Sequence, residues 1–199
     1  MCCFRVKFSL YIVGVDRIMS EIIHLAGCAA LSQFRLDKLA RLLPDYECIA
    51  TQFWHFSETS TVLDDSAKAT LTSLLTYGTP TTTPTQGTMM LVVPRPGTIS
   101  PWSSKATDIA KHCGLAAISR IERGTAYTFQ RHDGTVLTAT DLAVIAPHIH
   151  DRMTEVILDG LDAAHVLFRH LPPKPLTTVN ILAGGHDALA VANTALGLA

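Results

Sequence analysis

The strongest constraint on the fold is an order of strand and helix patterns that occurs twice along the chain. A short apolar run begins each half, and a segment with apolar residues at helical spacing comes after it. The Thr/Pro-rich segment 79–87 separates the halves and has no periodicity, which is typical of a loop. The expected strands are 22–25, 46–56, 89–93, 115–123 and 125–131, the last two joined by a tight turn at Gly124; the expected helices are 31–43, 65–77, 101–113 and one beginning at 138–141. This order predicts an α+β fold of duplicated strand-helix units with a mostly antiparallel sheet.

The two ends of the chain differ from this duplicated region. Residues 1–18 fit poorly with the rest of the chain, so we expect them to be a non-native or mis-assigned extension, with Met19 as the true start. Residues 19–147 then form the domain. From His148 the pattern is helical and amphipathic as far as the proline-rich segment 171–175, beyond which lies an apolar end with a helix over 187–196. We expect residues 148–199 to be a helical and extended linker that packs on a neighbouring domain.

Composition excludes several classes of protein. Sixteen Lys and Arg against 17 Asp and Glu give a net charge of -1, so no basic field favours a nucleic-acid partner. Five cysteines, an odd and scattered set, indicate free thiols and a cytoplasmic, reducing compartment. No apolar run approaches the about 18 residues of a spanning helix, so we expect no membrane association.

The densest group of chemically useful side chains lies in the segment 94–108, where three prolines and a glycine restrict the path of the chain. Ser100 before Pro101 fits an N-cap with proline at the first helical position. The exposed N–H groups of such a helix start could hold an anion, whereas the alternative is a capped helix whose hydroxyls bond their own backbone. The candidate interface or phosphate-facing residues are Arg95, Thr98, Ser100, Trp102, Ser103, Ser104 and Lys105.

A second polar group occupies residues 150–155. In the predicted helix, Asp151 and Glu155 share a face that Arg152 borders. A solvated helix face and a docking surface for another domain both fit this pattern. Asp151, Arg152 and Glu155 are therefore further interface candidates.

Motifs for catalysis or cofactor binding are absent from the sequence. The nine histidines form only close pairs without metal-ligand spacing, and the glycine-rich nucleotide motifs do not occur. Cys113 is expected near the negative end of a helix, which disfavours a thiolate. We therefore expect no catalytic, cofactor-binding or metal residue in this chain.

Several stretches are similar to one protein family. Residues 93–109, residues 120–124 with Tyr127, residues 150–155 and residues 193–199 resemble the N-terminal domain and linker of the large, single-chain phosphoribosylformylglycinamidine synthase (FGAM synthase). That enzyme is the glutamine-dependent ligase of purine biosynthesis. The resemblance runs from about residue 20 to the last residue, and residues 1–18 have no counterpart in it.

The resemblance implies a non-catalytic role. In that family ATP and Mg2+ activate formylglycinamide ribonucleotide in a synthetase domain, and ammonia released from glutamine in a glutaminase domain displaces phosphate to give the amidine. The N-terminal domain resembles a fused pair of the small accessory subunits of the split enzyme, and it packs close to the synthetase active site. The resemblance therefore implies synthetase and glutaminase domains as partners, ATP and Mg2+ bound outside this chain, and a fragment that is inactive alone.

Two other interpretations stay open at the level of the sequence. The chain could be a standalone accessory subunit that recruits separate synthetase and glutaminase chains. It could also be an independent small enzyme that uses the helix start at Ser100 to Lys105 as a phosphate site.

Overall fold

The computed structural model describes residues 7–9, 21–84, 86–169 and 175–197. Contacts divide the chain into a compact unit that ends at Arg169 and a second unit, His170–Ala199. The elements of the first unit are β1 (Lys7–Ser9), β2 (Glu21–Ala29), α1 (Gln33–Leu42), β3 (Tyr46–Thr59), α2 (Asp65–Leu75), β4 (Thr88–Pro94), α3 (Pro101–His112), β5 (Ile118–Arg131), α4 (Ala139–Ile149), β6 (Glu155–Leu158) and the 3-10 helix η1 (Leu161–Phe168); the second unit contains α5 (Ile181–Leu196).

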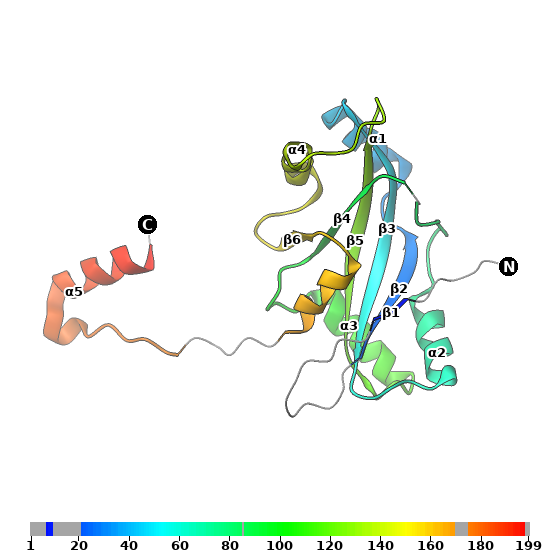
Figure 1. Ribbon diagram of the computed structural model, residues 1–199. Coiled ribbons are helices and arrows are strands. Elements are labelled where there is room, and N and C mark those ends of the chain that lie inside the picture. The colour runs from blue at the N-terminus through cyan, green and yellow to red at the C-terminus, as the bar shows by residue number, and fades with distance from the viewer. Residues whose placement is uncertain (1–6, 10–20, 85, 170–174, 198–199) are drawn as a thin grey trace. The chain divides into compact units, whose positions relative to one another are not determined.

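Six strands form one sheet in the order β1-β2-β3-β5-β4-β6, and each pairing between described strands is antiparallel (Figure 1). The central strands β3 and β5 have 14 residues each and pair along their whole length, from Tyr46 with Arg131 to Thr59 with Ile118. β2 flanks β3 and β4 flanks β5, so each half of the duplicated pattern places its first strand outside its second. The α+β fold of strand-helix units is confirmed, whereas the resemblance to a fused pair of accessory subunits stays a prediction.

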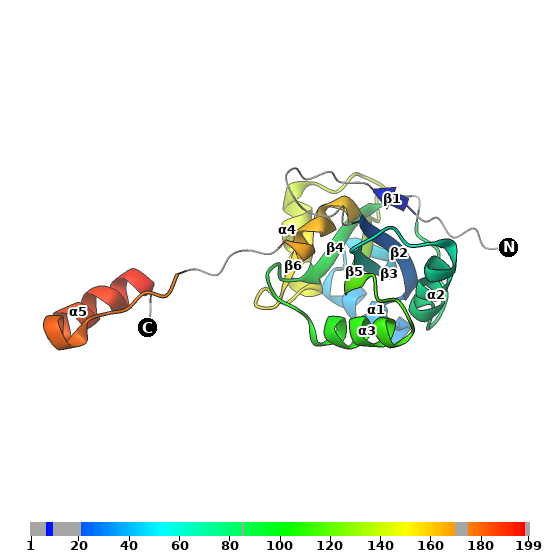
Figure 2. The same ribbon diagram turned by 90° about the horizontal axis from the view of Figure 1, so that it is seen from below.

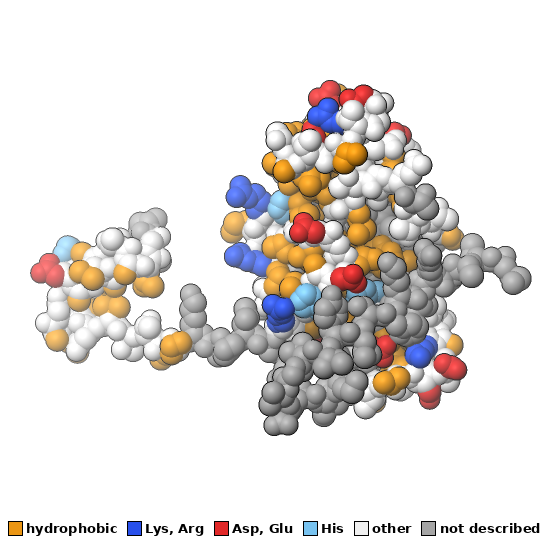
Figure 3. Space-filling model, viewed as in Figure 1, with side chains coloured by type: hydrophobic (Ala, Val, Ile, Leu, Met, Phe, Trp, Pro, Cys, Tyr) orange, Lys and Arg blue, Asp and Glu red, His pale blue; other side chains and the backbone are white. Residues whose placement is uncertain are grey.

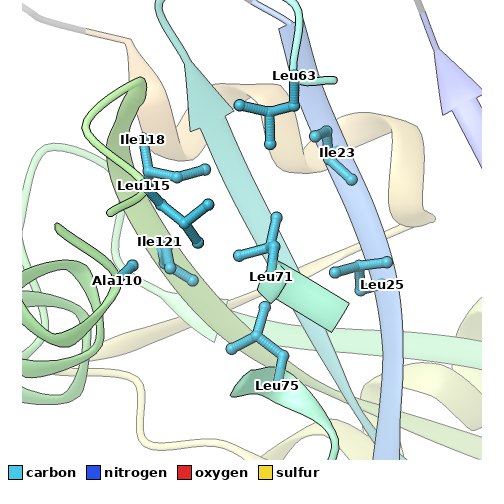
Figure 4. Packing of buried hydrophobic residues seen from close by; sticks show 9 residues of the cluster. All are labelled: Ile23, Leu25, Leu63, Leu71, Leu75, Ala110, Leu115, Ile118 and Ile121. Atoms are coloured by element: carbon cyan, nitrogen blue, oxygen red, sulfur yellow. The ribbon is translucent and has the colours of Figure 1, made fainter. Parts of the chain in front are cut away.

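Alternation along the strands divides the apolar side chains between two faces of the sheet. On one face, α2 and α3 pack with β2 and β5, and Figure 4 shows Leu71, Leu75 and Ile121 converging there. On the same face, α1 and α4 cover a second cluster that includes Tyr127 and Phe129 of β5. The opposite face carries a third cluster under η1, and Figure 2 shows η1 and α3 on opposite sides of the strands.

Side-chain caps fix the starts of α2, α3, α4 and α5. At α4, Thr138 and Asp141 form a capping box, in which the Thr138 hydroxyl accepts from Asp141 N and the Asp141 carboxylate accepts from Thr138 N. Asp141 also accepts from the Tyr46 hydroxyl at 2.8 Å and from Arg131 at 2.5 Å, and these donors hold the pKa of its carboxyl well below the ordinary value. One buried carboxylate thus ties α4 to both central strands.

The prediction of two strands joined at Gly124 is wrong, because β5 runs unbroken through this residue. A Cβ at Gly124 would lie 2.9 Å from Cγ1 of Val93 and 3.1 Å from the carbonyl oxygen of Val92. The glycine therefore permits close approach of β4 and β5 instead of forming a turn.

The prediction of a continuous amphipathic helix from His148 is also wrong. α4 ends at Ile149, residues 152–154 form a turn, and Val156 and Ile157 pair with Val93 and Val92 of β4. β-Branched residues suit a strand of this kind better than a helix. β6 and η1 thus belong to the first compact unit, and the assignment of residues 148–199 as a linker to a synthetase domain stays a prediction.

The two terminal segments differ in how much of each the structure describes. The predicted helix over 187–196 is confirmed within α5, which kinks at Gly185 and contains no buried residue. Most of the predicted extension 1–18, with Met19, lies outside the described residues; the backbone of Lys7–Ser9 pairs with β2. No helix of the described chain combines the length and apolarity that crossing a bilayer requires.

Candidate functional site

The start of α3 is built as the sequence predicts. Ser100 has an extended backbone, its hydroxyl accepts from Ser103 N at 3.0 Å, and Pro101 occupies the first helical position. Thr98 closes the preceding turn by donating its hydroxyl to the Arg95 carbonyl at 2.6 Å. The loop and the helix start therefore satisfy much of their own hydrogen bonding.

A buried ion pair lies directly behind this helix start. Glu122 of β5 is fully buried, and its carboxylate accepts from the Ser100 hydroxyl at 3.0 Å and from the guanidinium of Arg120. Arg120 donates in addition to the carbonyls of Thr98 at 2.7 Å and Leu167 at 3.0 Å. One Arg–Glu pair thus connects the loop, β5 and η1.

This arrangement bears on the predicted anion site. The Ser100 hydroxyl already donates its proton to Glu122 and accepts from Ser103 N, so it has no proton left to donate to an incoming phosphate. Ser103 is buried, and among the described residues its hydroxyl has no hydrogen-bond partner. The phosphate-facing role therefore stays a prediction, and the geometry gives Ser100 a structural role.

The other predicted residues of this segment divide by exposure. Arg95, Thr98, Ser104 and Lys105 are exposed, whereas Trp102 is half-buried and packs against the α2–α3 cluster. The exposed side chains can meet another domain, and Trp102 anchors the helix that carries them.

The second predicted cluster lies beside the first in space. The backbone N–H of Arg95 donates to the Thr154 carbonyl at 2.9 Å, and Pro94 pairs with Glu155. Asp151 and Glu155 do not share a helix face: Asp151 N donates to the Glu155 carboxylate at 2.9 Å across a turn. The structure therefore places two segments far apart in the sequence side by side, and we call their exposed residues Arg95, Ile99, Arg152 and Met153 the 95/152 surface.

A group of aromatic and cationic side chains on the opposite face of the sheet from η1 has no counterpart among the sequence predictions. The Arg123 guanidinium lies 4.1 Å from the Phe53 ring centroid and 4.7 Å from that of Trp102, and it donates to the Tyr77 hydroxyl at 3.2 Å. That hydroxyl lies 2.8 Å from Nε2 of His55. Because arginine can only donate, the Tyr77 proton is available to a neutral His55.

Burial and the charge of Arg123 lower the pKa of His55 to about 4. His55 is therefore neutral at physiological pH, and its ring stacks on Trp102 at a centroid distance of 5.6 Å. No sequence motif could have revealed this group, because its members come from β3, the segment after α2, α3 and β5.

Metal and thiol chemistry find no support in the described residues. These residues contain no group of three His, Cys, Asp or Glu side chains arranged to hold a metal ion. Cys28, Cys48 and Cys113 are free, and burial raises the pKa of the Cys48 thiol to about 12.

The sequence matches the model of one protein family, described as "Formylglycinamide ribonucleotide amidotransferase N-terminal", over residues 52–168. The match covers more than half of the 199 residues. It begins in β3, ends at the last residue of η1, and includes both segments of the 95/152 surface.

Proposed function

The chain belongs to the formylglycinamide ribonucleotide amidotransferase N-terminal family, and from this membership we propose that it is the non-catalytic N-terminal part of an FGAM synthase. In that role it scaffolds the synthetase part of the enzyme, which converts formylglycinamide ribonucleotide to the amidine with glutamine and ATP. The chain alone is inactive, and it works in the cytoplasm, where its free cysteines stay reduced.

The 95/152 surface is the proposed contact with the synthetase part. Met153 is 78% exposed and Ile99 is 62% exposed, and the exposed cations Arg95 and Arg152 lie on the same segments. Figure 3 shows Lys and Arg side chains gathered at the side of the molecule where β6 lies, with hydrophobic atoms between them. Exposed apolar side chains bordered by arginines are typical of protein interfaces.

The buried pair of Arg120 and Glu122 supports this assignment. It holds the Thr98 carbonyl and the Ser100 hydroxyl, and therefore fixes the loop between Arg95 and α3. A rigid loop loses little conformational entropy when a partner binds it.

The second unit supports a scaffold in a different way. α5 buries none of its residues and exposes Ile181, Leu182, Leu189 and Val191. An apolar helix of this kind is stable in water only when another surface covers it. We propose that the synthetase part covers this helix.

ATP and Mg2+ belong to the synthetase part in this proposal. The described residues have no acidic cluster that would suit Mg2+, which takes oxygen ligands. The proposal assigns no step of the reaction to residues of this chain.

Co-purification tests the proposal. A tagged form of the chain should capture, in a one-to-one complex, an amidotransferase from the same source from which the N-terminal region has been removed. The double variant Arg95→Ala, Arg152→Ala should lose capture, whereas Arg35→Ala, Arg41→Ala on exposed positions of α1 should keep it. Equal capture by both variants would contradict the assigned surface, and no capture by the unaltered chain would contradict the function.

The size of the native product separates a fused domain from a standalone accessory subunit. An antibody against residues 20–150 should detect, in source cells, a band several times larger than 21.5 kDa. A single band near 21.5 kDa would favour the standalone subunit.

A further inference from the structure

A hollow of about 200 Å3 lies between α2 and α3. Leu74, Leu75 and Ile109 form apolar walls, Trp102 and Tyr77 add aromatic surface, and Lys105 brings an ammonium group. The volume is small beside the about 300 to 1,000 Å3 of pockets for drug-sized ligands, so it suits a molecule with one ring or one branched chain.

The charge in the lining of the hollow is positive. Lys105 is the one charged residue among those that line it, and no ion pair between described residues involves Lys105 or Arg123. Arg123 lies against Trp102 and donates to Tyr77, two of the lining residues, and so adds positive potential at that end. His55 behind them is neutral, so the two cations carry the charge.

We propose that this hollow binds a small organic carboxylate with an apolar ring or branched chain. The apolar body packs against Leu74 and Ile109 beside the Trp102 ring, and the carboxylate faces the ammonium of Lys105. An apolar hollow into which a few polar groups point is typical of a ligand site. The proposal goes beyond the scaffold function and does not depend on it, because no residue of the 95/152 surface lines the hollow.

Titration of the unaltered chain, monitored by 1H–15N NMR, tests the site with three probes. Phenylacetate should give saturable shifts confined to the amides around residues 74–77 and 102–109. Phenylacetamide, which has the same shape without the charge, should bind about two- to fivefold more weakly, since an exposed ion pair contributes at most about 1 kcal/mol. Acetate, which lacks the apolar body, should give no saturable shifts.

Two matched lysine variants of α3 test the charge. Lys105→Met should weaken the binding of phenylacetate by the same factor and leave the affinity for phenylacetamide unchanged. Lys111→Met, on an exposed position outside the lining, should alter neither affinity. Absence of saturable shifts with phenylacetate, equal affinity for the amide, or equal behaviour of the two variants would each overturn the proposal.

Discussion

The hydroxyl of Ser100 donates a hydrogen bond to Oε2 of Glu122 at 3.0 Å and thereby joins the amino end of α3 to the first half of β5. The same hydroxyl accepts from Ser103 N, so it is both the helix cap and a ligand of the buried carboxylate. Arg120 completes the arrangement by pairing with Glu122 and holding Thr98. The proline-rich segment that resembles the amidotransferase family is therefore firmly fixed to the sheet.

Glu122→Gln should lower the free energy of unfolding by about 3 kcal/mol, because it leaves Arg120 without its buried partner. Urea denaturation measures the change. Glu47→Gln, on an exposed position of β3, is the control and should stay within about 0.5 kcal/mol of the unaltered chain. Similar values for both variants would show that the pair adds nothing to stability.

Ser100→Ala should cost about 1 kcal/mol of stability or more, because the α3 cap and a hydrogen bond to Glu122 are lost together. Ser104→Ala, four residues later on an exposed position of the same helix, should change stability by less than about 0.5 kcal/mol. Thermal unfolding compares the two variants directly. An equal loss of stability in both would contradict the capping role of Ser100.

Gly124→Ala should destabilise the sheet by about 1 to 3 kcal/mol, because the new methyl group would lie 2.9 Å from Val93 Cγ1. Gly160 has an extended backbone and nothing within 4 Å of the corresponding Cβ position. Gly160→Ala should therefore be neutral or slightly stabilising in the same denaturation experiment. Tolerance of alanine at both positions would argue against close approach of β4 and β5.

Acidification should destabilise the fold through His55. Its folded pKa of about 4 lies below its ordinary value of 6.5, so the unfolded chain takes up the proton first. The stability that neutral His55 contributes is complete above pH 6.5. It is lost toward pH 4, where the free energy of unfolding falls by about 1.4 kcal/mol for each pH unit in that window. Asp141, whose pKa is also lowered, changes the free energy of unfolding only as the pH falls below its ordinary pKa of 3.8.

Denaturation between pH 6.5 and about pH 5 separates the effect of His55 from that of Asp141, because only His55 of these two groups titrates there. His55→Gln should flatten the pH dependence, whereas His132→Gln, on an exposed loop position, should preserve it. A slope that survives His55→Gln would assign the pH dependence to other groups.

Arg95→Ala should lower the activity of the complete amidotransferase severalfold without lowering the stability of this chain, because the Arg95 side chain is exposed and only its backbone bonds to Thr154. Steady-state kinetics and thermal unfolding of the same variant check both halves of the statement. Unchanged kinetics would restrict the loop to structural packing.

The order of elements from β2 to α4 could be predicted from the sequence, apart from the division of β5, because each half carries its own periodicity. The α3 start was recognisable from Ser100 and Pro101, since a cap and a first-turn proline act locally. The α4 start was recognisable in the same way from Thr138 and Asp141. These features depend on residues adjacent in the chain, whose identity and spacing can be read directly from a sequence.

The errors concern contacts between distant segments. Glycine is a residue type that is common in turns, and only the close approach of Val93 shows why Gly124 lies within β5. Residues 153–157 satisfy helical spacing, yet β4 offers an edge that takes them as a strand. The group of His55, Tyr77 and Arg123 comes from three separate parts of the chain, so spacing along the sequence carries no signal of it.

Reconstitution of FGAM synthase activity tests the central claim most directly. Purified chain is added to an amidotransferase that lacks its N-terminal region, and ADP formation that requires both formylglycinamide ribonucleotide and glutamine is measured. We expect no activity from the chain alone, weak activity from the shortened enzyme, and a saturable increase when the two are mixed. Turnover by the chain alone, or an unchanged rate in the mixture, would contradict a non-catalytic domain that scaffolds the synthetase.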